Sequence, residues 1–401
     1  MTECINIDVR RTPSSEDDVP FLYVISSEVP HTRAAGSIVL HRMLKDWPPK
    51  RMTVCGPPPP EVAQTLDCNY VAWKPFASRM QVSRFHTLAP PLSWIQPVRP
   101  PVEKQPGPGV VVTIMQASVY YRGAAWFARR HSLPLVLIVH DDPEKLEGVR
   151  PWNRPLVHAG NRRVYRFASE RFCISPEMEK SLRERYGAPG SVLYPNRSPD
   201  IRSRSESMNS ALRRGNRLTI GYAGSLVYGY REGIENLLPL FRDVGATLRV
   251  YSIHEPKFAH GAELEYAGAS ATPEAVWPQI QAECDAVILP YCGPEDGHVE
   301  LYRTHFPSKL TEYLALGMPV IVSGPEYATG VRWAARNPKA CVCMELANPA
   351  EWRAMLVRLC NDSDWRLALA SGALSAAGGD FDPETIRRKF QDRLMKLQGG
   401  S

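Results

Sequence analysis

The sequence contains no hydrophobic run long enough to cross a membrane, which takes about 20 apolar residues. Its longest apolar stretches, residues 110–115 and 133–139, have the length of buried strands. Residues 1–18 lack the apolar core of a secretory signal peptide and are expected to form a flexible lead-in. We therefore expect a cytoplasmic protein without a transmembrane segment.

Motifs that mark several common enzyme classes are also missing. No HExxH sequence and no Cys/His cluster occurs, so nothing predicts a zinc site. The sequences GxSxG and GxxxxGK followed by Ser or Thr are absent, which leaves a hydrolase or a P-loop ATPase without support. No DxD sequence stands at the end of an expected strand, where metal-dependent transferases use one. We expect neither a metal site nor a resident cofactor.

Disulfide bonds are not expected, although the sequence has nine cysteines. The count is odd, the chain is long and no CxxC pair occurs. Cys341 and Cys343, the closest pair, alternate within an apolar run and should lie on one face of a single strand. We interpret the cysteines as reduced and mostly structural, which favours the cytosol.

Positive charge is concentrated in one part of the chain. The net charge is +6, yet residues 150–217 alone contain 15 Lys and Arg against 6 Asp and Glu. Such a stretch can bind an anionic membrane surface, a phosphorylated acceptor or nucleic acid, or it can be a solvated helix face with a basic linker. No nucleic-acid-binding signature accompanies it, so we expect no nucleic acid as partner.

Short apolar runs alternate with amphipathic stretches, a pattern typical of parallel sheets covered by helices. The polar segment 197–217 has no apolar periodicity and divides this pattern in two. The sequence therefore predicts an α/β protein with two Rossmann-like, doubly wound parallel-sheet domains. The expected strands are 21–27, 51–56, 110–115, 134–140 and 170–175, then 217–224, 247–252, 264–269, 285–291, 319–324 and 340–344.

We assign residues 18–196 to an N-terminal domain, 197–217 to a linker, 218–378 to a C-terminal domain and 379–398 to a final helix. Asp382 is the expected N-cap of that helix. The proline-rich segment 75–108 is expected to be irregular. Open sheets of this type bind ligands at the carboxyl ends of their strands, so the cleft between the two domains is the expected active site.

The most informative segment is HFPSKLTEYLALGMPVIVSG, residues 305–324. Pro307 and Ser308 should open a helix that ends at Gly317, followed by a buried strand. The first backbone N–H groups of a helix have no partner within it and suit a phosphate. Lys309 and Glu312 share one face of this helix, so a cation can meet a diphosphate while a carboxylate accepts hydrogen bonds from a ribose diol.

This segment resembles the donor-site motif of GT-B glycosyltransferases, especially the bacterial retaining enzymes of the family 4-like group. The resemblance implies two Rossmann-like domains that face a cleft, with Glu312 on the nucleotide ribose and Ser308 near the diphosphate. Many retaining members carry a second Glu eight positions before the first, and here that position is Thr304. Glu300, just upstream, could substitute for it.

Three further loops fit the same resemblance. The segment 221–238 leads from a strand through Gly224 and Ser225 to a helix that begins near Gly233. Arg231, just before it, is the expected second cation for the diphosphate. Gly36 precedes a helix as the family's first glycine-containing loop does, under the donor phosphates. A plain strand–turn–helix explains either loop as well.

The strand 134–140 ends with His140, followed by Asp141 and Asp142. By resemblance, His140 contacts the donor sugar or organises the acceptor, and Asp141 or Asp142 acts as a base or binds acceptor hydroxyls. The sequence does not separate the two aspartates. A purely structural histidine is the alternative.

These features predict a glycosyltransferase that moves a sugar from a nucleotide-diphosphate-sugar co-substrate to a glycan, lipid-linked or small-molecule acceptor, with retention of configuration and without a metal. The expected location is the cytoplasm, with peripheral contact at the cytoplasmic face of the membrane as one option. Two alternatives stay open. A nucleotide-sugar epimerase of the same architecture would need paired acid/base carboxylates, and an inactive homologue would bind the donor or a partner transferase without turnover.

Overall fold

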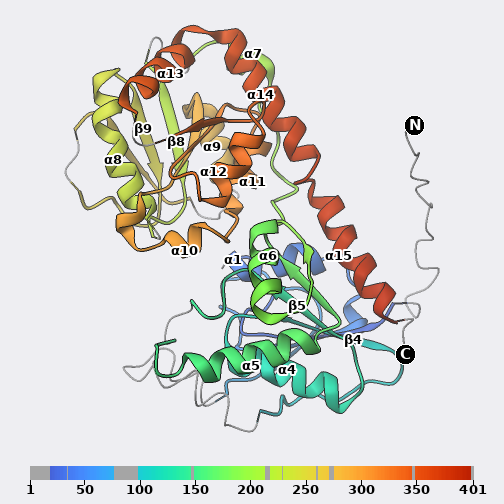
Figure 1. The fold of residues 1–401 in the computed structure, drawn as a ribbon. Coiled ribbons are helices and arrows are strands. Elements are labelled where there is room, and N and C mark those ends of the chain that lie inside the picture. The colour runs from blue at the N-terminus through green and yellow to red at the C-terminus, as the bar shows by residue number, and fades with distance from the viewer. Residues whose placement is uncertain are drawn as a thin grey trace, which may run out of the picture.

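The computed structural model describes residues 19–33, 35–75, 98–145, 149–212, 217–227, 229–258, 261–270, 275–345 and 348–398. These residues form two α/β domains, one above the other in Figure 1, and a long C-terminal helix runs along one side of both. The expected lead-in and most of the proline-rich segment lie outside the described residues.

The N-terminal sheet has seven parallel strands in the order β3-β2-β1-β4-β5-β6-β7. Its central strands are almost wholly buried because helices cover both faces, as the continuous apolar runs require. The strands are β1 (Phe21–Ile25), β2 (Met52–Gly56), β3 (Asn69–Ala72), β4 (Gly109–Ile114), β5 (Leu135–Val139), β6 (Glu170–Cys173) and β7 (Ser191–Val192). The helices are α1 (Ala35–Leu44), η2 (Pro49–Arg51), α4 (Ser118–Arg130), α5 (Arg154–Phe167) and α6 (Pro176–Tyr186).

The C-terminal sheet repeats this arrangement with six parallel strands in the order β10-β9-β8-β11-β12-β13. The strands are β8 (Thr219–Ala223), β9 (Thr247–Tyr251), β10 (Leu264–Gly268), β11 (Ala286–Pro290), β12 (Val320–Ser323) and β13 (Val342–Met344). The helices are α7 (Glu206–Ser210), α8 (Tyr230–Asp243), α9 (Val276–Glu283), η4 (Pro294–Asp296), α10 (Val299–Tyr302), α11 (Ser308–Ala315), α12 (Thr329–Arg336), α13 (Pro349–Asn361) and α14 (Ser363–Gly378).

The predicted architecture of two doubly wound parallel sheets is confirmed, and all eleven expected strands are present. The sequence reading missed β3 and β7. β3 is a partly exposed edge strand without an apolar run, and β7 is only two residues long. The eight cysteines within the described residues are all free thiols, and Cys341 lies just before β13 while Cys343 lies within it.

The final helix, α15 (Pro383–Gln398), leaves the C-terminal domain and packs on the N-terminal one. Its start is as expected, because the backbone N–H of Thr385 donates to the Asp382 carboxylate over 2.8 Å. Ile386, Phe390 and Leu394 join the core of the N-terminal sheet, and the Phe390 ring lies 5.4 Å from that of Phe172. The chain therefore connects the two domains twice, once near residue 197 and once through α15.

The linker is not an extended tether along its whole length. Residues 206–210 form α7, which packs against α14. Arg204 is buried and donates from Nη1 to the carbonyl of Cys284 over 2.8 Å, and Asn209 donates to the carbonyl of Gly317 over 2.8 Å. The part of the linker from Arg204 to α7 therefore belongs structurally to the C-terminal domain. No helix within the described residues is long and apolar enough to cross a membrane.

Candidate active site

The loop after β8 and the start of α11 meet at the carboxyl edge of the C-terminal sheet. Strand order reverses between β8 and β11, which is where open α/β sheets form a ligand-binding crevice. Gly224, directly after β8, has φ +130°. A Cβ at this position would lie 2.3 Å from Cε of Lys309, so a glycine is needed for this close approach.

Lys309 lies in the first turn of α11 and is half-buried. Its Nζ is 4.1 Å from the centroid of the Tyr230 ring and 5.7 Å from that of Tyr222. Burial lowers the pKa of Lys309 to about 8. Ser308 is exposed at the helix start, and the first turn of α11 contains no acidic residue. This edge can therefore hold an anion between the backbone N–H groups and the ammonium group.

Glu312, one turn further along α11, joins the two domains. The Glu312 side chain is about nine-tenths buried, and its Oε1 accepts from Arg42 Nη1 on α1 over 2.7 Å. The backbone N–H of Ser198 lies 3.3 and 3.2 Å from the two carboxylate oxygens. Arg42 also donates to the carbonyl of Asn196 over 2.8 Å. The carboxylate expected to bind ribose thus takes part in a buried contact between the domains.

Ser225 and Arg231, the other residues expected to bind the donor, are both exposed and follow β8. Ser225 is exposed, and its carbonyl accepts from the Tyr222 hydroxyl over 2.6 Å. Arg231 is exposed in the first turn of α8, with its guanidinium carbon 5.9 Å from the centroid of the Phe258 ring. It therefore lies toward the loop that follows β9.

Gly36 lies in the first turn of α1, where a Cβ would come within 3.2 Å of Glu28 Cγ. Next to it, Ser37 donates to Glu28 Oε2 over 3.0 Å. Gly36 therefore lets the loop after β1 approach the start of the helix that carries Arg42.

On the acceptor side, His140 and Asp141 follow β5 at the carboxyl edge of the N-terminal sheet, and both are half-buried. Burial lowers the pKa of His140 to about 4 and also lowers that of His305, while the Asp141 charge opposes both shifts. The Asp141 charge thus acts on one histidine from each domain. Neutral imidazoles in this position can accept a proton or a hydrogen bond.

The structure separates the two neighbouring aspartates. Asp142 is buried, accepts from Arg185 Nη1 over 2.6 Å and accepts from the backbone N–H of Glu144 over 3.0 Å. It is committed to contacts within the N-terminal domain. Asp141 is half-buried, and it is the aspartate whose charge acts on His140 and His305.

Glu300, the residue that could substitute for the missing Glu, has an exposed side chain. Its side chain on α10 is 62% exposed, 3.9 Å from Nζ of Lys145 and 3.8 Å from Nε of Arg303. The carbonyl of Thr304 accepts from the Ser175 hydroxyl of the N-terminal domain over 2.5 Å. Glu300 thus lies at the rim of the cleft, opposite Lys145.

Sequence reasoning missed two residues that the fold brings to this site. Arg42 gives no local signal, because its partner Glu312 is 270 positions away. His305 directly follows Thr304, the position where many retaining members carry a Glu. A titratable side chain beside this position could have been proposed as a site residue from the sequence. No group of three or more His, Cys, Asp or Glu side chains suited to a metal ion occurs in the part of the chain that the structure describes.

Comparisons with known proteins concern the N-terminal domain and the fold. Residues 30–196 match the family model described as glycosyl transferase 4-like domain. Sucrose-phosphate synthase from Thermosynechococcus elongatus is 14% identical, with a TM-score of 0.64 over 96% of this chain and 100% of that one. Anabaena HepE in complex with UDP-glucose is 16% identical, with a TM-score of 0.61 over 94% and 99%.

The glycosyltransferase WaaG, involved in lipopolysaccharide biosynthesis, is 12% identical, with a TM-score of 0.56 over 95% of this chain and 100% of that one. At these identities, the likeness to the solved structures establishes the fold. No protein with a curated description matches the sequence.

The environment of Lys309 makes a testable prediction. In an NMR titration of the reductively ¹³C-methylated protein, the Lys309 signal should titrate near pH 8, because burial disfavours the charged ammonium. The Lys309→Arg variant assigns the signal by its disappearance. Titration of that signal at about 10.4, the usual value for lysine, would contradict the burial described here.

Proposed function

We propose that this chain, which has the GT-B fold and carries a glycosyl transferase 4-like domain over residues 30–196, transfers a sugar from a nucleotide-diphosphate sugar to an acceptor. The observation that carries the proposal is the edge of the C-terminal sheet. There a helix start, a half-buried lysine and a buried carboxylate converge on the cleft within five residues of α11. These are the groups that a diphosphate and a ribose diol require.

The donor would lie with its ribose on Glu312 and its diphosphate against Ser308, Lys309 and Gly224. Helix N–H groups and Lys309 would offset the charge of the leaving diphosphate, with no metal or further cofactor. Arg231 and Ser225 would join only if the loops after β8 and β9 close on the donor. UDP-sugars are the first candidates, since the similar HepE structure contains UDP-glucose.

The acceptor would enter from the N-terminal side, near His140, Asp141 and Gly36. Asp141 and the two histidines around it would bind acceptor hydroxyls and receive the proton of the attacking one. Relative movement of the domains about the segment before Arg204 would align the two substrates. Nothing in the comparisons points to the epimerase alternative, and an inactive homologue remains an outcome of the experiments below.

Glu312→Gln should weaken the binding of nucleoside diphosphates about 10- to 100-fold, because the ribose loses hydrogen bonds to a charged acceptor. Thermal shift and calorimetric titration with UDP, GDP, ADP and dTDP measure this loss. Arg42→Gln is the matched control, since it removes the same ion pair but leaves the carboxylate. It should bind the nucleotide at least as tightly as the wild type. Equal weakening in both variants would mean that Glu312 only joins the domains.

We propose retention of the anomeric configuration, by resemblance to the retaining group. With an α-linked donor, ¹H NMR of the fresh product should then show the small anomeric coupling of an α-linkage. A β-linked product would overturn this proposal and leave the donor site unaffected.

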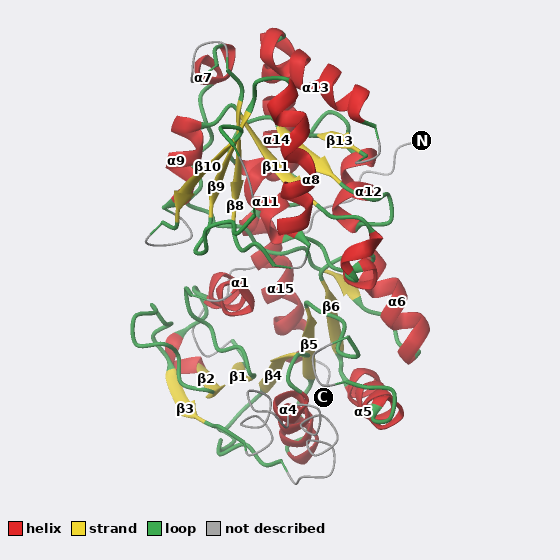
Figure 2. Cartoon of the chain, turned by 90° about the vertical axis from the view of Figure 1, so that its left-hand side faces the viewer, coloured by secondary structure: helices red, strands yellow, loops and turns green. Residues whose placement is uncertain are grey.

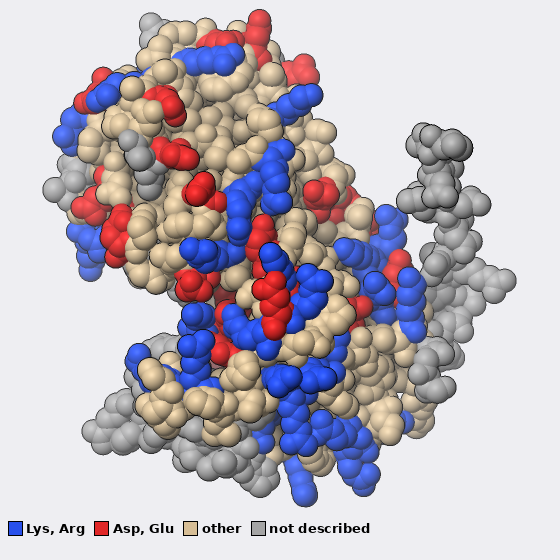
Figure 3. All heavy atoms as spheres, viewed as in Figure 1, with Lys and Arg blue, Asp and Glu red and all other residues tan. Residues whose placement is uncertain are grey.

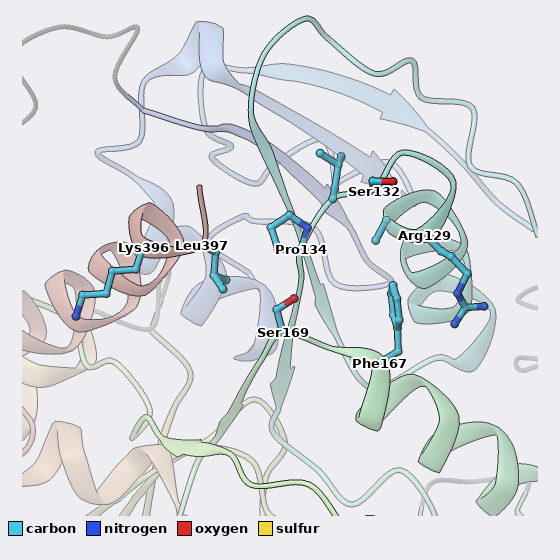
Figure 4. Close-up of a pocket in the computed structure, with 9 residues that line it drawn as sticks. Arg129, Ser132, Pro134, Phe167, Ser169, Lys396 and Leu397 are labelled. Atoms are coloured by element: carbon cyan, nitrogen blue, oxygen red, sulfur yellow. The ribbon is translucent and has the colours of Figure 1, made fainter. Parts of the chain in front are cut away.

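We also propose that the protein works in the cytoplasm, at the membrane face. The support is a set of exposed residues. Arg162, Arg163, Arg166 and Leu156 (43% exposed) lie on α5, and Trp152 (61% exposed) comes just before this helix. In Figure 3 the lower part of the molecule, where α4 and α5 lie, shows many basic and few acidic side chains. A cavity of about 540 Å³ lies between the ends of α4, α5 and α15, lined by Arg129, Phe167 and Lys396 among others (Figure 4). Basic and aromatic side chains together are typical of surfaces that bind anionic lipid.

Vesicle co-sedimentation tests this surface. The wild type should bind vesicles that contain phosphatidylglycerol more tightly than vesicles of phosphatidylcholine alone, and Arg163→Gln/Arg166→Gln should lose most of the difference. Each charge contributes about 1 kcal/mol near such a surface. Lys339→Gln/Arg388→Gln, at exposed positions on other elements, is the charge-matched control and should behave as the wild type. Equal binding to both kinds of vesicle would contradict the proposal.

A further inference from the structure

A second cavity of about 700 Å³ opens on the N-terminal domain, between the end of β5 and the start of α5. Five of its lining residues are basic: Lys145, Arg150, Arg154, His158 and Arg185. Several positive charges in one cavity repel each other unless negative charge from the protein or from a ligand lies beside them. Among the described residues, carboxylates contact some of these basic side chains and leave others exposed.

The buried carboxylate of Glu144 contacts two of these basic side chains, Arg154 and His158. The Glu144 side chain is only 1% exposed, and it accepts from the Tyr186 hydroxyl over 2.9 Å. The His158 Nδ1 lies 2.8 Å and the Arg154 Nε 3.3 Å from its oxygens. The Arg154 side chain is nevertheless 59% exposed and that of His158 39% exposed. Their outer atoms therefore face the cavity while their inner nitrogens are fixed.

Asp142 does the same for Arg185. The carboxylate accepts from Arg185 Nη1 over 2.6 Å, while Nη2 donates to Ser181 Oγ over 3.2 Å. The two buried carboxylates thus fix the guanidinium groups of Arg154 and Arg185 before any ligand arrives. Preorganised guanidinium groups match the oxygen geometry of phosphate better than that of an uncharged sugar.

The remaining wall adds to the positive potential. Lys145 is 40% exposed, and its Nζ lies 3.9 Å from a carboxylate oxygen of Glu300. Arg150 is exposed at the rim. The 14-residue helix α5 begins at Arg154 with no acidic residue in its first turn, so its N-terminus faces the cavity with positive polarity.

The position of the cavity relates it to the proposed reaction. Asp142 directly follows Asp141, and Lys145 lies beside Glu300 of the opposite domain, so the cavity borders the acceptor side of the cleft. We propose that this cavity binds a phosphate group of the acceptor, so that the acceptor is a sugar phosphate or a lipid-linked sugar phosphate. This inference rests on the proposed function and specifies the class of its acceptor.

Binding of glucose 6-phosphate, compared with glucose, tests the proposal. The full chain should bind the phosphate ester at least about tenfold more tightly, even with UDP at saturation, because the two sites are separate. Lys145→Gln/Arg150→Gln should remove about tenfold of that affinity, whereas the charge-matched Lys339→Gln/Arg388→Gln should not. Lys145 and Arg150 are the residues of choice because the buried carboxylates do not depend on them.

Vesicles that contain phosphatidylglycerol distinguish the source of the phosphate. Vesicle binding that Lys145→Gln/Arg150→Gln abolishes, without binding of glucose 6-phosphate, assigns the cavity to a lipid-linked phosphate. Binding of glucose 6-phosphate assigns it to a soluble one. If Lys145→Gln/Arg150→Gln loses neither glucose 6-phosphate binding nor vesicle binding, the inference is wrong.

Nucleoside diphosphate binding separates this inference from the proposed function. Suppose that UDP binding is intact in Lys145→Gln/Arg150→Gln, and that the wild type shows neither glucose 6-phosphate binding nor vesicle binding that depends on these two residues. This result would overturn the inference alone. Binding of glucose 6-phosphate without binding of any nucleoside diphosphate would support an anion site in the cavity and would contradict the proposed glycosyltransferase function.

Discussion

The buried ion pair between Arg42 and Glu312 connects the two domains at the point where we propose that the nucleotide binds. Removing one partner of such a pair typically costs about 3–5 kcal/mol, because the other charge is left buried. The same carboxylate cannot bind a ribose diol in full while Arg42 and the Ser198 N–H hold it. Donor binding must therefore share or replace the contact that sets the distance between the domains. In the proposed binding mode, the distance between the domains and the occupation of the donor site are coupled through the Glu312 side chain.

The remaining features fit around this contact. Gly224 allows Lys309 to lie against the loop after β8, and the two tyrosine rings keep its ammonium beside the helix start. His305 precedes the same helix, and the charge of Asp141 on the other domain acts on its ring. In the proposed binding mode, residues 305–312 would contribute to the diphosphate, ribose and acceptor sides of the site. α15 follows the C-terminal domain in sequence and packs on the N-terminal domain through Phe390 and its neighbours, so it also connects the two domains.

Local patterns were enough to predict the fold and the start of α11. Alternation of apolar runs and helices identified both sheets, and Pro307, Ser308 and Gly317 identified the helix. Long-range pairs were beyond such reasoning. Nothing near Arg42 marks it as the partner of Glu312, and nothing in HDDP separates Asp141 from Asp142 until Arg185 is placed beside the latter. Glu300 was chosen by proximity in sequence, and the fold leaves it at the exposed rim.

A crystal structure of the protein with a bound nucleoside diphosphate tests the account most directly. The account predicts that both ribose hydroxyls donate to the Glu312 carboxylate, that Arg42 has moved from Oε1, and that the diphosphate lies against Lys309 and Gly224. A nucleotide bound elsewhere, or one bound here with the Arg42–Glu312 pair intact and no ribose contact to Glu312, would contradict it.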